Sequence, residues 1–399
     1  MTEDSAPGSA WAGTAAALLP ADGSAGALAG RVWDPAVNGP SVVAVREGDV
    51  WGVAEAFPTM RDLCELADPA SALASAAGAR LGSVEDILAN SASQDRDPST
   101  PHFLAPIDLQ VIKAAGVTFA ASMIERVIEE RLRGDPASAT EIRELVRAAV
   151  GPEFGTLVPG SDAAAALKRL LIAKGLWSPY LEVAIGPDAE IFTKAPVLSA
   201  VGTGQAVGVL AASSWNNPEP EVAVLVQSSG GIVGATLAND VNLRDIEGRS
   251  ALLLPKAKDN TGSCAIGPLV RFFDSSFSLD AVREMSVRLR VDGRDGFHLD
   301  EISNMKLISR DPADLVAQLI GPQHQYPDGA ILLLGTMFAP VADRCESGLG
   351  FTHARGDIVR ISSVELGTLV NVVLSSEECP PWDYGIAALM RNLAGRGIL

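Results

Sequence analysis

The spacing of hydrophobic positions changes near residue 190. Before that point, two stretches place apolar residues on one helical face: residues 122–133, with Met123, Val127 and Ile128, and residues 162–174. After it, short apolar runs alternate with Gly, Pro and Asn turns, at 222–226, 232–237, 269–273, 286–291, 331–334 and 358–361. This pattern predicts amphipathic helices followed by a β-dominated α+β domain without βαβ alternation.

The first hundred residues have a weaker pattern of their own. Residues 42–56 contain short apolar runs broken by Arg46-Glu47-Gly48-Asp49, which predicts a β-hairpin. Residues 62–88 mix helical spacing with small residues, and the polar, Pro-containing stretch 91–101 is typical of a linker. We therefore predict a small N-terminal α/β domain over residues 1–100 and a larger domain over residues 101–399.

The composition indicates a substantial hydrophobic core and an acidic surface. Of the 399 residues, 47% are hydrophobic and 20% are charged, and the net charge is −18. Such a surface repels nucleic acid and anionic membranes, so neither is expected as a partner. No apolar run reaches the roughly 18 residues of a membrane helix, and the Ala-rich start lacks the basic residues of a secretory signal. We expect a cytoplasmic protein.

The cysteines show no spacing that would suggest a metal site or a disulfide framework. They are Cys64, Cys264, Cys345 and Cys379, with no CxxC pair and no Cys/His cluster. Free thiols in a reducing compartment are therefore expected, and zinc is not.

Three carboxylates are the candidates for metal binding. Glu219 and Glu221 lie two positions apart just before an apolar strand, where alternate side chains point to the same face. Asp240 follows the next apolar run, and Lys258 follows a third run, Leu252–Leu254. Because these charges come at the ends of successive predicted strands, we expect one shared pocket. Oxygen ligands of this kind suit Mg²⁺, with Mn²⁺ as an alternative, in an enzyme acting on a 2-oxo acid.

Several ordered motifs resemble the fumarylacetoacetate hydrolase superfamily over about residues 105–399, with an interruption between about 134 and 175. They are Pro218-Glu219-Pro220-Glu221, Asn239-Asp240-Val241-Asn242-Leu243-Arg244-Asp245, Lys258 before Gly267-Pro268, Gly335-Thr336, Gly356-Asp357, and Glu365-Leu366-Gly367-Thr368-Leu369-Val370-Asn371. The resemblance implies a mixed β-sandwich roll, usually dimeric, that holds Mg²⁺ or Mn²⁺. It also implies Glu219, Glu221 and Asp240 as metal ligands, Lys258 as the active-site lysine, and Thr336 as a contact to the substrate carboxylate.

The chain departs from the hydrolases of this family at one position. Those enzymes carry a His and a Glu that together activate water, and the matching positions here hold Ser122 and Glu125. Serine alone cannot act as a base near neutral pH, whereas His can. Dehydration needs no activated water, because a metal can stabilise the enolate that forms when a 2-oxo acid loses a proton from carbon 3. The missing His therefore favours dehydration over hydrolysis.

Two further motifs resemble the 2-keto-3-deoxypentonate dehydratases of the same superfamily. They are Glu190-Ile191-Phe192-Thr193-Lys194-Ala195 and Ile246-Glu247-Gly248. This resemblance implies Mg²⁺-dependent dehydration of a small-molecule 2-oxo sugar acid, a 2-keto-3-deoxypentonate, to 2,5-dioxopentanoate by a homodimer. The alternatives are a hydrolase of acylpyruvates or diketo acids with the same metal site, and a sugar-acid sensor without turnover.

The remaining side chains receive roles within this hypothesis. Glu190 and Glu125 are the candidate acid/base carboxylates, since burial would raise the pKa of a carboxyl toward the useful range; structural ion pairs are the alternative. Lys258 would hold a substrate oxygen or move a proton. The candidate substrate contacts are Ser122, Lys194, Thr336 and Arg244. Lys194 could equally be a surface charge, and Arg244 could pair with Asp245.

Overall fold

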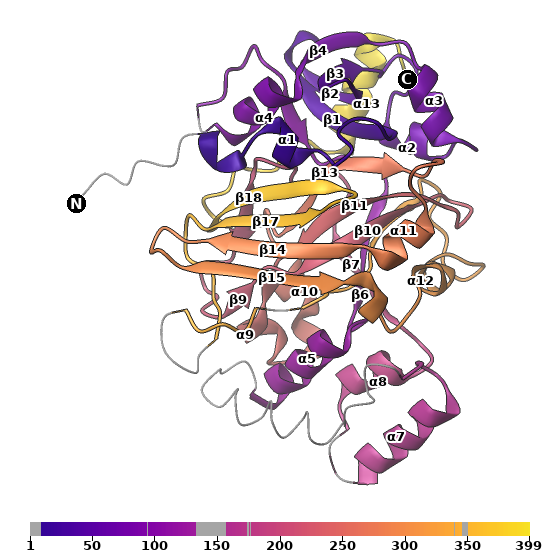
Figure 1. Ribbon diagram of the computed structural model, residues 1–399, viewed down its shortest axis with the longest axis vertical. Helices are drawn as coiled ribbons and strands as arrows, with labels where there is room; N and C mark the ends of the chain where they lie inside the picture. The colour runs from indigo at the N-terminus through magenta and orange to yellow at the C-terminus, as the bar shows by residue number, and fades with distance from the viewer. Residues whose placement is uncertain are drawn as a thin grey trace.

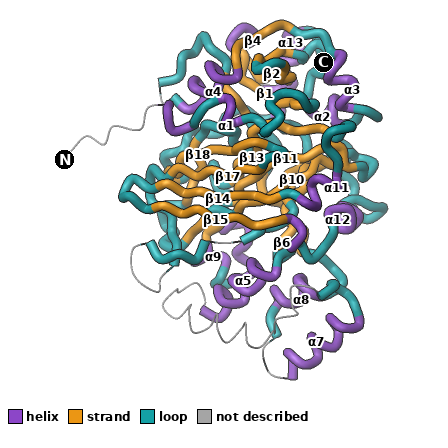
Figure 2. The backbone as a smooth tube through the Cα atoms, in the orientation of Figure 1, coloured by secondary structure: helices purple, strands orange, loops and turns teal. Residues whose placement is uncertain are grey.

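Two β-sheets packed face to face make the body of the molecule, with helices at both ends (Figures 1 and 2). The computed structural model describes residues 9–93, 95–132, 157–173, 175, 177–338, 340–344 and 350–399. Within these residues one sheet has eleven strands and the other has five. The predicted β-dominated α+β fold, a mixed sandwich roll, is confirmed.

The larger sheet runs through the whole molecule. In spatial order its strands are β4 (Ala79–Ser83), β3 (Asp49–Gly52), β2 (Gly39–Arg46), β1 (Leu28–Asp34), β13 (Cys264–Phe272), β11 (Ile232–Asp240), β10 (Pro220–Val226), β16 (Ala330–Leu333), β6 (Val111–Gly116) and β7 (Glu190–Ala195), and β5 (His102–Leu104) also pairs with β1. Neighbouring strands are antiparallel except β16 and β6, which are parallel.

The smaller sheet covers one face of the larger one. Its order is β15 (His298–Asn304), β14 (Ser286–Asp292), β17 (Ile358–Ser363), β18 (Gly367–Ser375) and β8 (Ala206–Val209). A separate short pair joins β9 (Asn216–Asn217) to β12 (Asn242–Leu243). Of the six predicted apolar runs, four correspond to β10, β11, β13 and β16 of the larger sheet and two to β14 and β17 of the smaller one.

Alternation along the central strand β10 explains the layering. Val222 and Val224 belong to the hydrophobic core between the two sheets, together with Leu289 of β14. Ala223 and Leu225 point the other way, into a second core that includes side chains of α2 (Met60–Cys64) and α3 (Pro69–Ser75). Both faces of β10 are therefore buried, which is why its sequence is continuously apolar.

Short helices surround one end of the large sheet, below the strands in Figure 1. They are α5 (Ala120–Leu132), α7 (Asp162–Ala173), α8 (Pro179–Ile185), α9 (Arg244–Glu247) and α10 (Leu254–Lys258). The predicted helices 122–133 and 162–174 correspond to α5 and α7, while Arg133 and Lys174 lie outside the described residues. Further helices are α4 (Val84–Ala92), α11 (Leu279–Glu284), α12 (Pro312–Leu319) and α13 (Ile386–Arg396).

The large sheet continues across the predicted boundary at residue 100. β1 pairs with β13 through Leu28 opposite Arg271 and Ala29 opposite Val270. The C-terminal helix α13 returns to the N-terminal strands, where Asn392 donates to the Val37 carbonyl at 2.9 Å. The two-domain division stays a prediction, and the N-terminal segment shares its sheet with the rest of the chain.

The structure bears on two local features expected from the sequence, the N-terminal hairpin and the free cysteines. The predicted hairpin is formed by β2 and β3, and Glu47 and Gly48 take φ values of 51° and 80° in the tight turn. Cys64, Cys264 and Cys379 are free thiols, whereas Cys345 lies outside the described residues. Among the helices that the structure describes, none is long and apolar enough to cross a bilayer.

Candidate functional site

Glu219, Glu221 and Asp240 converge at one end of the large sheet. Glu221 lies on β10, and Asp240 ends the antiparallel neighbour β11, where its N–H donates to the Glu219 carbonyl at 3.1 Å. The Glu219 N–H in turn donates to the Asn239 side-chain oxygen at 3.1 Å. The three carboxylates are buried, and ligand oxygens from all three lie within 4.8 Å of one another. Pairing of β10 with β11 therefore creates the predicted cluster.

Lys258 lies against this cluster, but it reaches the site from a helix. The run Leu252–Leu254, read as a third strand, is helical instead: a 3-10 turn over Ala251–Leu253 leads into α10, which ends at Lys258. Its ammonium donates to Glu219 Oε2 at 2.6 Å and lies 3.3 Å from Asp240. Burial favours the neutral amine, but Asp240 and Glu219 raise the pKa of Lys258 above its ordinary value. Lys258 therefore carries a positive charge.

Lys194 is a buried member of the same cluster. It is 0% exposed, so the alternative of a plain surface charge is wrong. From β7 its ammonium lies 3.0 Å from Asp240 Oδ1 and donates to the carbonyl of Lys258. Lys194 thus ties β7 to β11 and α10 behind the carboxylates, and it is not among the residues that line the small cavity described below.

Thr336 and Gly335 bind the far side of the carboxylates. The Thr336 hydroxyl lies 2.9 Å from Glu219 Oε2 and 3.1 Å from Glu221 Oε1, and the Gly335 N–H donates to Glu221 Oε2 at 2.8 Å. Gly335 has φ +104°, and a Cβ there would lie 1.9 Å from the Thr118 hydroxyl oxygen. Only glycine allows this loop to place its N–H on Glu221.

The donor set fits a hard divalent cation. Burial and the charges of Asp240 and Glu219 raise the pKa of Glu221 well above its ordinary value. Burial acts the same way on Glu219, but Arg126 and Lys258 outweigh it and bring its pKa down to about 2. Asp240 Oδ1 accepts no hydrogen bond in good geometry from a described residue. Buried oxygens that repel one another are stabilised when a cation sits among them.

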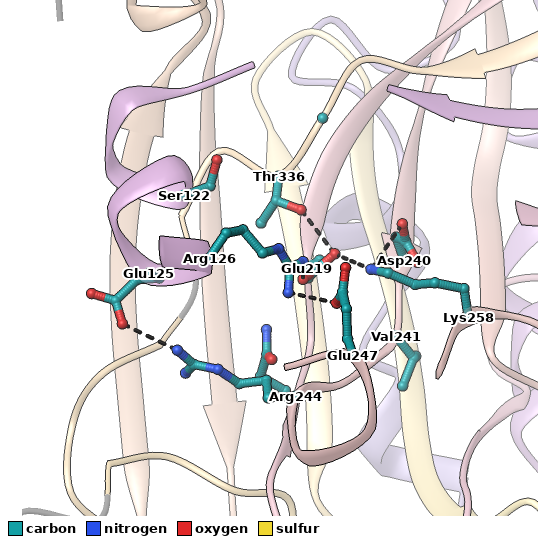
Figure 3. Close-up of polar contacts among 12 residues, drawn as sticks. Ser122, Glu125, Arg126, Glu219, Asp240, Val241, Arg244, Glu247, Lys258 and Thr336 are labelled. Carbon is teal, nitrogen blue, oxygen red and sulfur yellow. Dashed lines mark hydrogen bonds and ion pairs between the residues drawn. The ribbon is translucent and has the colours of Figure 1, made fainter. Parts of the chain in front are cut away.

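Arg126 and Glu247 belong to the site although sequence reasoning gave them no role (Figure 3). Arg126 extends from α5 and pairs with Glu219, and its other nitrogen donates to Glu247 Oε2 at 2.6 Å. Glu247 comes from α9, so this guanidinium joins two helices to the end of β10. Arg126 directly follows the family-matched Glu125, and Glu247 lies in a family-matched motif, but neither position indicated its contact.

We expect Arg126→Met to destabilise the protein when divalent cations are chelated. The substitution removes the guanidinium that pairs with the buried carboxylates of Glu219 and Glu247. We expect this to lower the free energy of unfolding by about 3 kcal/mol or more. Added Mg²⁺ should recover part of the loss by neutralising Glu219. Urea unfolding in EDTA and in Mg²⁺ measures both effects, with substitution of the exposed Arg169 of α7, Arg169→Met, as the matched control. Equal stability of the Arg126 variant and the wild type in EDTA would contradict the expectation.

Glu190 faces the cluster across a small cavity. The cavity has a volume of about 10 Å³, room for about one water molecule, and its lining includes Ser122, Arg126, Glu190, the three cluster carboxylates and Lys258. Burial raises the pKa of the Glu190 carboxyl. Gly116 makes room for it, because a Cβ there would lie 2.0 Å from Glu190 Oε2. A raised pKa makes this carboxyl a better proton acceptor than an ordinary glutamate, so it is a candidate acid/base group.

Glu125 and Arg244 lie beside the site rather than in it. The two side chains pair at 3.1 Å, and Arg244 also stacks on Trp215 at 4.3 Å from the ring centroid. Neither lines the small cavity, and Figure 3 shows Glu125 directed away from the carboxylates. The Asp245 carboxylate accepts hydrogen bonds from the Ser213 hydroxyl and the Ser214 N–H. The catalytic role of Glu125 and the substrate contact of Arg244 stay predictions. In the structure the two side chains form an ion pair next to the cavity, outside its lining.

One stretch of the chain matches a known protein family. Residues 187–374 match the fumarylacetoacetate hydrolase C-terminal family. This stretch, a little under half of the chain, is similar to that family. It includes Glu190, Glu219, Glu221, Asp240 and Lys258, whereas Ser122 and Arg126 of α5 precede it.

Curated proteins that are similar to part of this chain include sugar-acid dehydratases. A 2-dehydro-3-deoxy-D-arabinonate dehydratase of Saccharolobus solfataricus is 36% identical over 187 residues, which cover 46% of this chain and 58% of the relative. The chain thus spans less than two thirds of the length of the curated relatives that it matches.

Solved structures show the same fold. A 2-keto-3-deoxy-D-arabinonate dehydratase complexed with magnesium and 2,5-dioxopentanoate has a TM-score of 0.60 at 21% identity, over 87% of this chain and 99% of the other. A fumarylacetoacetate hydrolase from psychrophilic Exiguobacterium antarcticum has a TM-score of 0.55 at 14% identity, over 88% and 99%.

Proposed function

We propose that the protein is a Mg²⁺-dependent hydro-lyase that converts a 2-keto-3-deoxypentonate to 2,5-dioxopentanoate. The observation that carries the proposal is the buried cluster of Glu219, Glu221 and Asp240 facing Glu190 and Lys258. The relative from Saccharolobus solfataricus, named for this class of substrate, supports it. So does the neighbouring structure, whose ligands are magnesium and 2,5-dioxopentanoate.

In this proposal each residue around the cluster has a separate role in binding or proton transfer. A cation held by Glu219, Glu221 and Asp240 would bind the 2-oxo acid head and acidify carbon 3. Glu190 takes the proton from carbon 3, since its raised pKa suits it to both accept and return a proton. The charged Lys258 holds a substrate oxygen, and the Thr336 hydroxyl binds the substrate carboxylate.

Reaching 2,5-dioxopentanoate requires more than the loss of water. Removal of the carbon-3 proton and the carbon-4 hydroxyl leaves a double bond between these carbons and a hydroxyl on carbon 5. The aldehyde forms only when a proton moves from carbon 5 to carbon 3 and the resulting enol ketonises. Glu190 can serve both steps, because it can pass the carbon-3 proton to the departing hydroxyl, which leaves as water, and the regenerated carboxylate can then carry a proton from carbon 5 to carbon 3.

The cavity composition favours dehydration over hydrolysis. All four histidines of the chain, His102, His298, His324 and His353, are described, and none lines the cavity between Glu190 and the carboxylates. Ser122 does line it, but its hydroxyl donates to the Phe119 carbonyl at 2.9 Å, so it is not directed as a base. An acylpyruvate hydrolase would need another group to activate water.

Substrate binding would require the site to open. A pentonate cannot enter a cavity of about 10 Å³, and Arg126 already occupies the approach to Glu219. We propose that the ion pair between Arg126 and Glu219 breaks when the Glu219 carboxylate binds a cation. The guanidinium of Arg126 would then bind an oxygen of the substrate. Retention of the Glu247 contact would keep Arg126 close to the site during this change.

Direct turnover tests the proposal. Carbon 4 is the single stereocentre of the substrate, so the arabinonate and xylonate names of the D series describe one compound, and testing both enantiomers covers the possible substrates. Purified protein with Mg²⁺ should convert one enantiomer to the semialdehyde, and EDTA should stop it. No turnover of either enantiomer, or turnover of an acylpyruvate instead, would refute the dehydratase assignment. Light scattering would test the predicted dimer.

Gly116→Ala should impair turnover while leaving the fold intact. The new Cβ would collide with the Glu190 carboxyl, which is the movable end of a side chain and not backbone. A displacement of about 1 Å at a reacting group costs about 100-fold in rate, so kcat should fall by at least that factor. Gly395→Ala, where no heavy atom lies within 4 Å, is the control. An unchanged kcat with an unchanged melting temperature would contradict the role of Glu190.

A further inference from the structure

Two adjoining cavities lie apart from the carboxylate cluster, between the N-terminal strands and the segment that leads into α13. Their volumes are about 270 Å³ and about 620 Å³. Both are lined by Arg96, Gln205, Ala206 and Pro380, so these residues mark the boundary between them. Glu219, Glu221, Asp240 and Lys258 line neither cavity, so this region is separate from the proposed active site.

The smaller cavity has an aromatic wall. Trp33, Trp382 and Tyr384 line it, and the rings of Trp33 and Tyr384 meet edge to face at 5.3 Å. The indole N–H of Trp382 donates to the Tyr384 carbonyl at 3.1 Å, which holds the two residues together. The hydroxyl of Tyr384 is buried and makes no hydrogen bond with any described residue. Such a wall suits a planar ring with a polar substituent.

Arg96 supplies positive charge at the junction. One nitrogen donates to the Ser91 carbonyl at 3.1 Å, while the buried Nε has no hydrogen-bond partner among the described residues. No ion pair of Arg96 is found in that part of the chain, and burial lowers its pKa. The second arginine of the cavity, Arg31, instead lies 3.7 Å from Asp108 and is thereby balanced. A partly buried guanidinium without a carboxylate partner is a ready site for an anion.

The larger cavity continues this positive region away from the aromatic wall. It is lined by Arg294 and Arg355 as well as Arg96, against the two acidic residues Asp95 and Glu378. Arg355 donates to Glu378 at 2.9 Å. A locally basic lining in a chain of net charge −18 would concentrate a small anion at this place.

We propose that these cavities bind a small aromatic anion, with its ring among Trp33, Trp382 and Tyr384 and its anionic group on Arg96. The smaller cavity, at about 270 Å³, is near the lower end of the range for small-molecule sites, so it takes a single ring system. The charge can be a carboxylate attached to the ring, or a phosphate that reaches Arg96 from the larger cavity through a spacer.

Titration of the purified full chain tests this site independently of turnover. Tryptophan fluorescence reports on it, because Trp33 and Trp382 line the cavity, and calorimetry gives the affinity. Benzoate and adenosine monophosphate are the two anionic probes, benzamide lacks the charge, and acetate lacks the ring. We expect at least one anionic probe to bind saturably, benzamide to bind at least about tenfold more weakly than benzoate, and acetate to give no signal. Tighter binding of the nucleotide would assign the charge to the larger cavity.

Matched variants locate the binding. Arg96→Gln should weaken binding of the anion at least about tenfold, while Arg169→Gln, which removes the same charge from an exposed position on α7, should not. Tyr384→Phe removes only the unbonded hydroxyl and gives a second, milder variant if Arg96→Gln does not fold. The absence of saturable binding by both anions, or equal affinity in the Arg96→Gln and wild-type proteins, would overturn the proposal.

Discussion

Glu190→Gln should lower kcat for the proposed dehydration by about 100- to 10,000-fold, the usual contribution of a general acid/base group. The substitution keeps the size of the side chain and its place over Gly116, but it removes the group that exchanges a proton. Because Glu190 is separate from the three clustered carboxylates, the affinity for Mg²⁺ should change little. Steady-state kinetics on the active enantiomer and calorimetry with Mg²⁺ measure the two effects.

Glu125→Gln is the informative control for that experiment. Both carboxylates were candidates for the acid/base role, but Glu125 pairs with Arg244 and lies outside the cavity lining. We therefore expect its substitution to change kcat by less than about tenfold, equivalent to about 1.4 kcal/mol. The reverse ranking, with a large loss for Glu125→Gln and a small one for Glu190→Gln, would show that the wrong carboxylate has been assigned.

Glu221→Gln should weaken Mg²⁺ binding by more than about 100-fold, since even outer partners of metal ligands contribute 10- to 100-fold. The amide oxygen can still accept the hydrogen bond from the Gly335 N–H, so the loop after β16 should keep its position. Turnover should be lost at Mg²⁺ concentrations that saturate the wild type. Calorimetry or Mn²⁺ paramagnetic resonance measures the affinity directly.

The same variant should behave differently without metal. Glu221 is buried beside Asp240 and Glu219, so removing its charge relieves repulsion in the metal-free protein. We expect the melting temperature of Glu221→Gln in EDTA to equal or exceed that of the wild type, and the increase on adding Mg²⁺ to be smaller. A variant that is less stable in EDTA yet responds fully to Mg²⁺ would argue against a cation at this cluster.

Much of the fold was accessible from the sequence because it rests on local patterns. The alternating and continuous apolar runs correspond to β10, β11, β13, β14, β16 and β17. Glu219 directly precedes β10 and Glu221 lies on it, so their two-residue spacing places both carboxylates on one side, and the pairing of β10 with β11 adds Asp240. These features depend on side-chain periodicity within a strand and on the adjacency of consecutive strands.

Other features depend on contacts between distant segments. Arg126 reaches Glu219 across 93 positions, and Glu247 meets Arg126 across 121. Lys258 was expected after a strand and comes from the short helix α10. No local period indicates which side of α5 faces α9 or the end of β10, because that is set by how the helix docks against the sheet.

The sequence by itself determined the three clustered carboxylates, the lysine beside them, the absence of a histidine at position 122 and the β-rich framework. Only the tertiary structure decided that Glu190, not Glu125, faces the cluster, that Lys194 is buried behind it, and that Arg126 bridges Glu219 to Glu247. The N-terminal strands likewise extend the large sheet through β1 and β13. The physical reason is that residue spacing specifies the face on which a side chain lies, whereas burial and long-range packing select which faces meet.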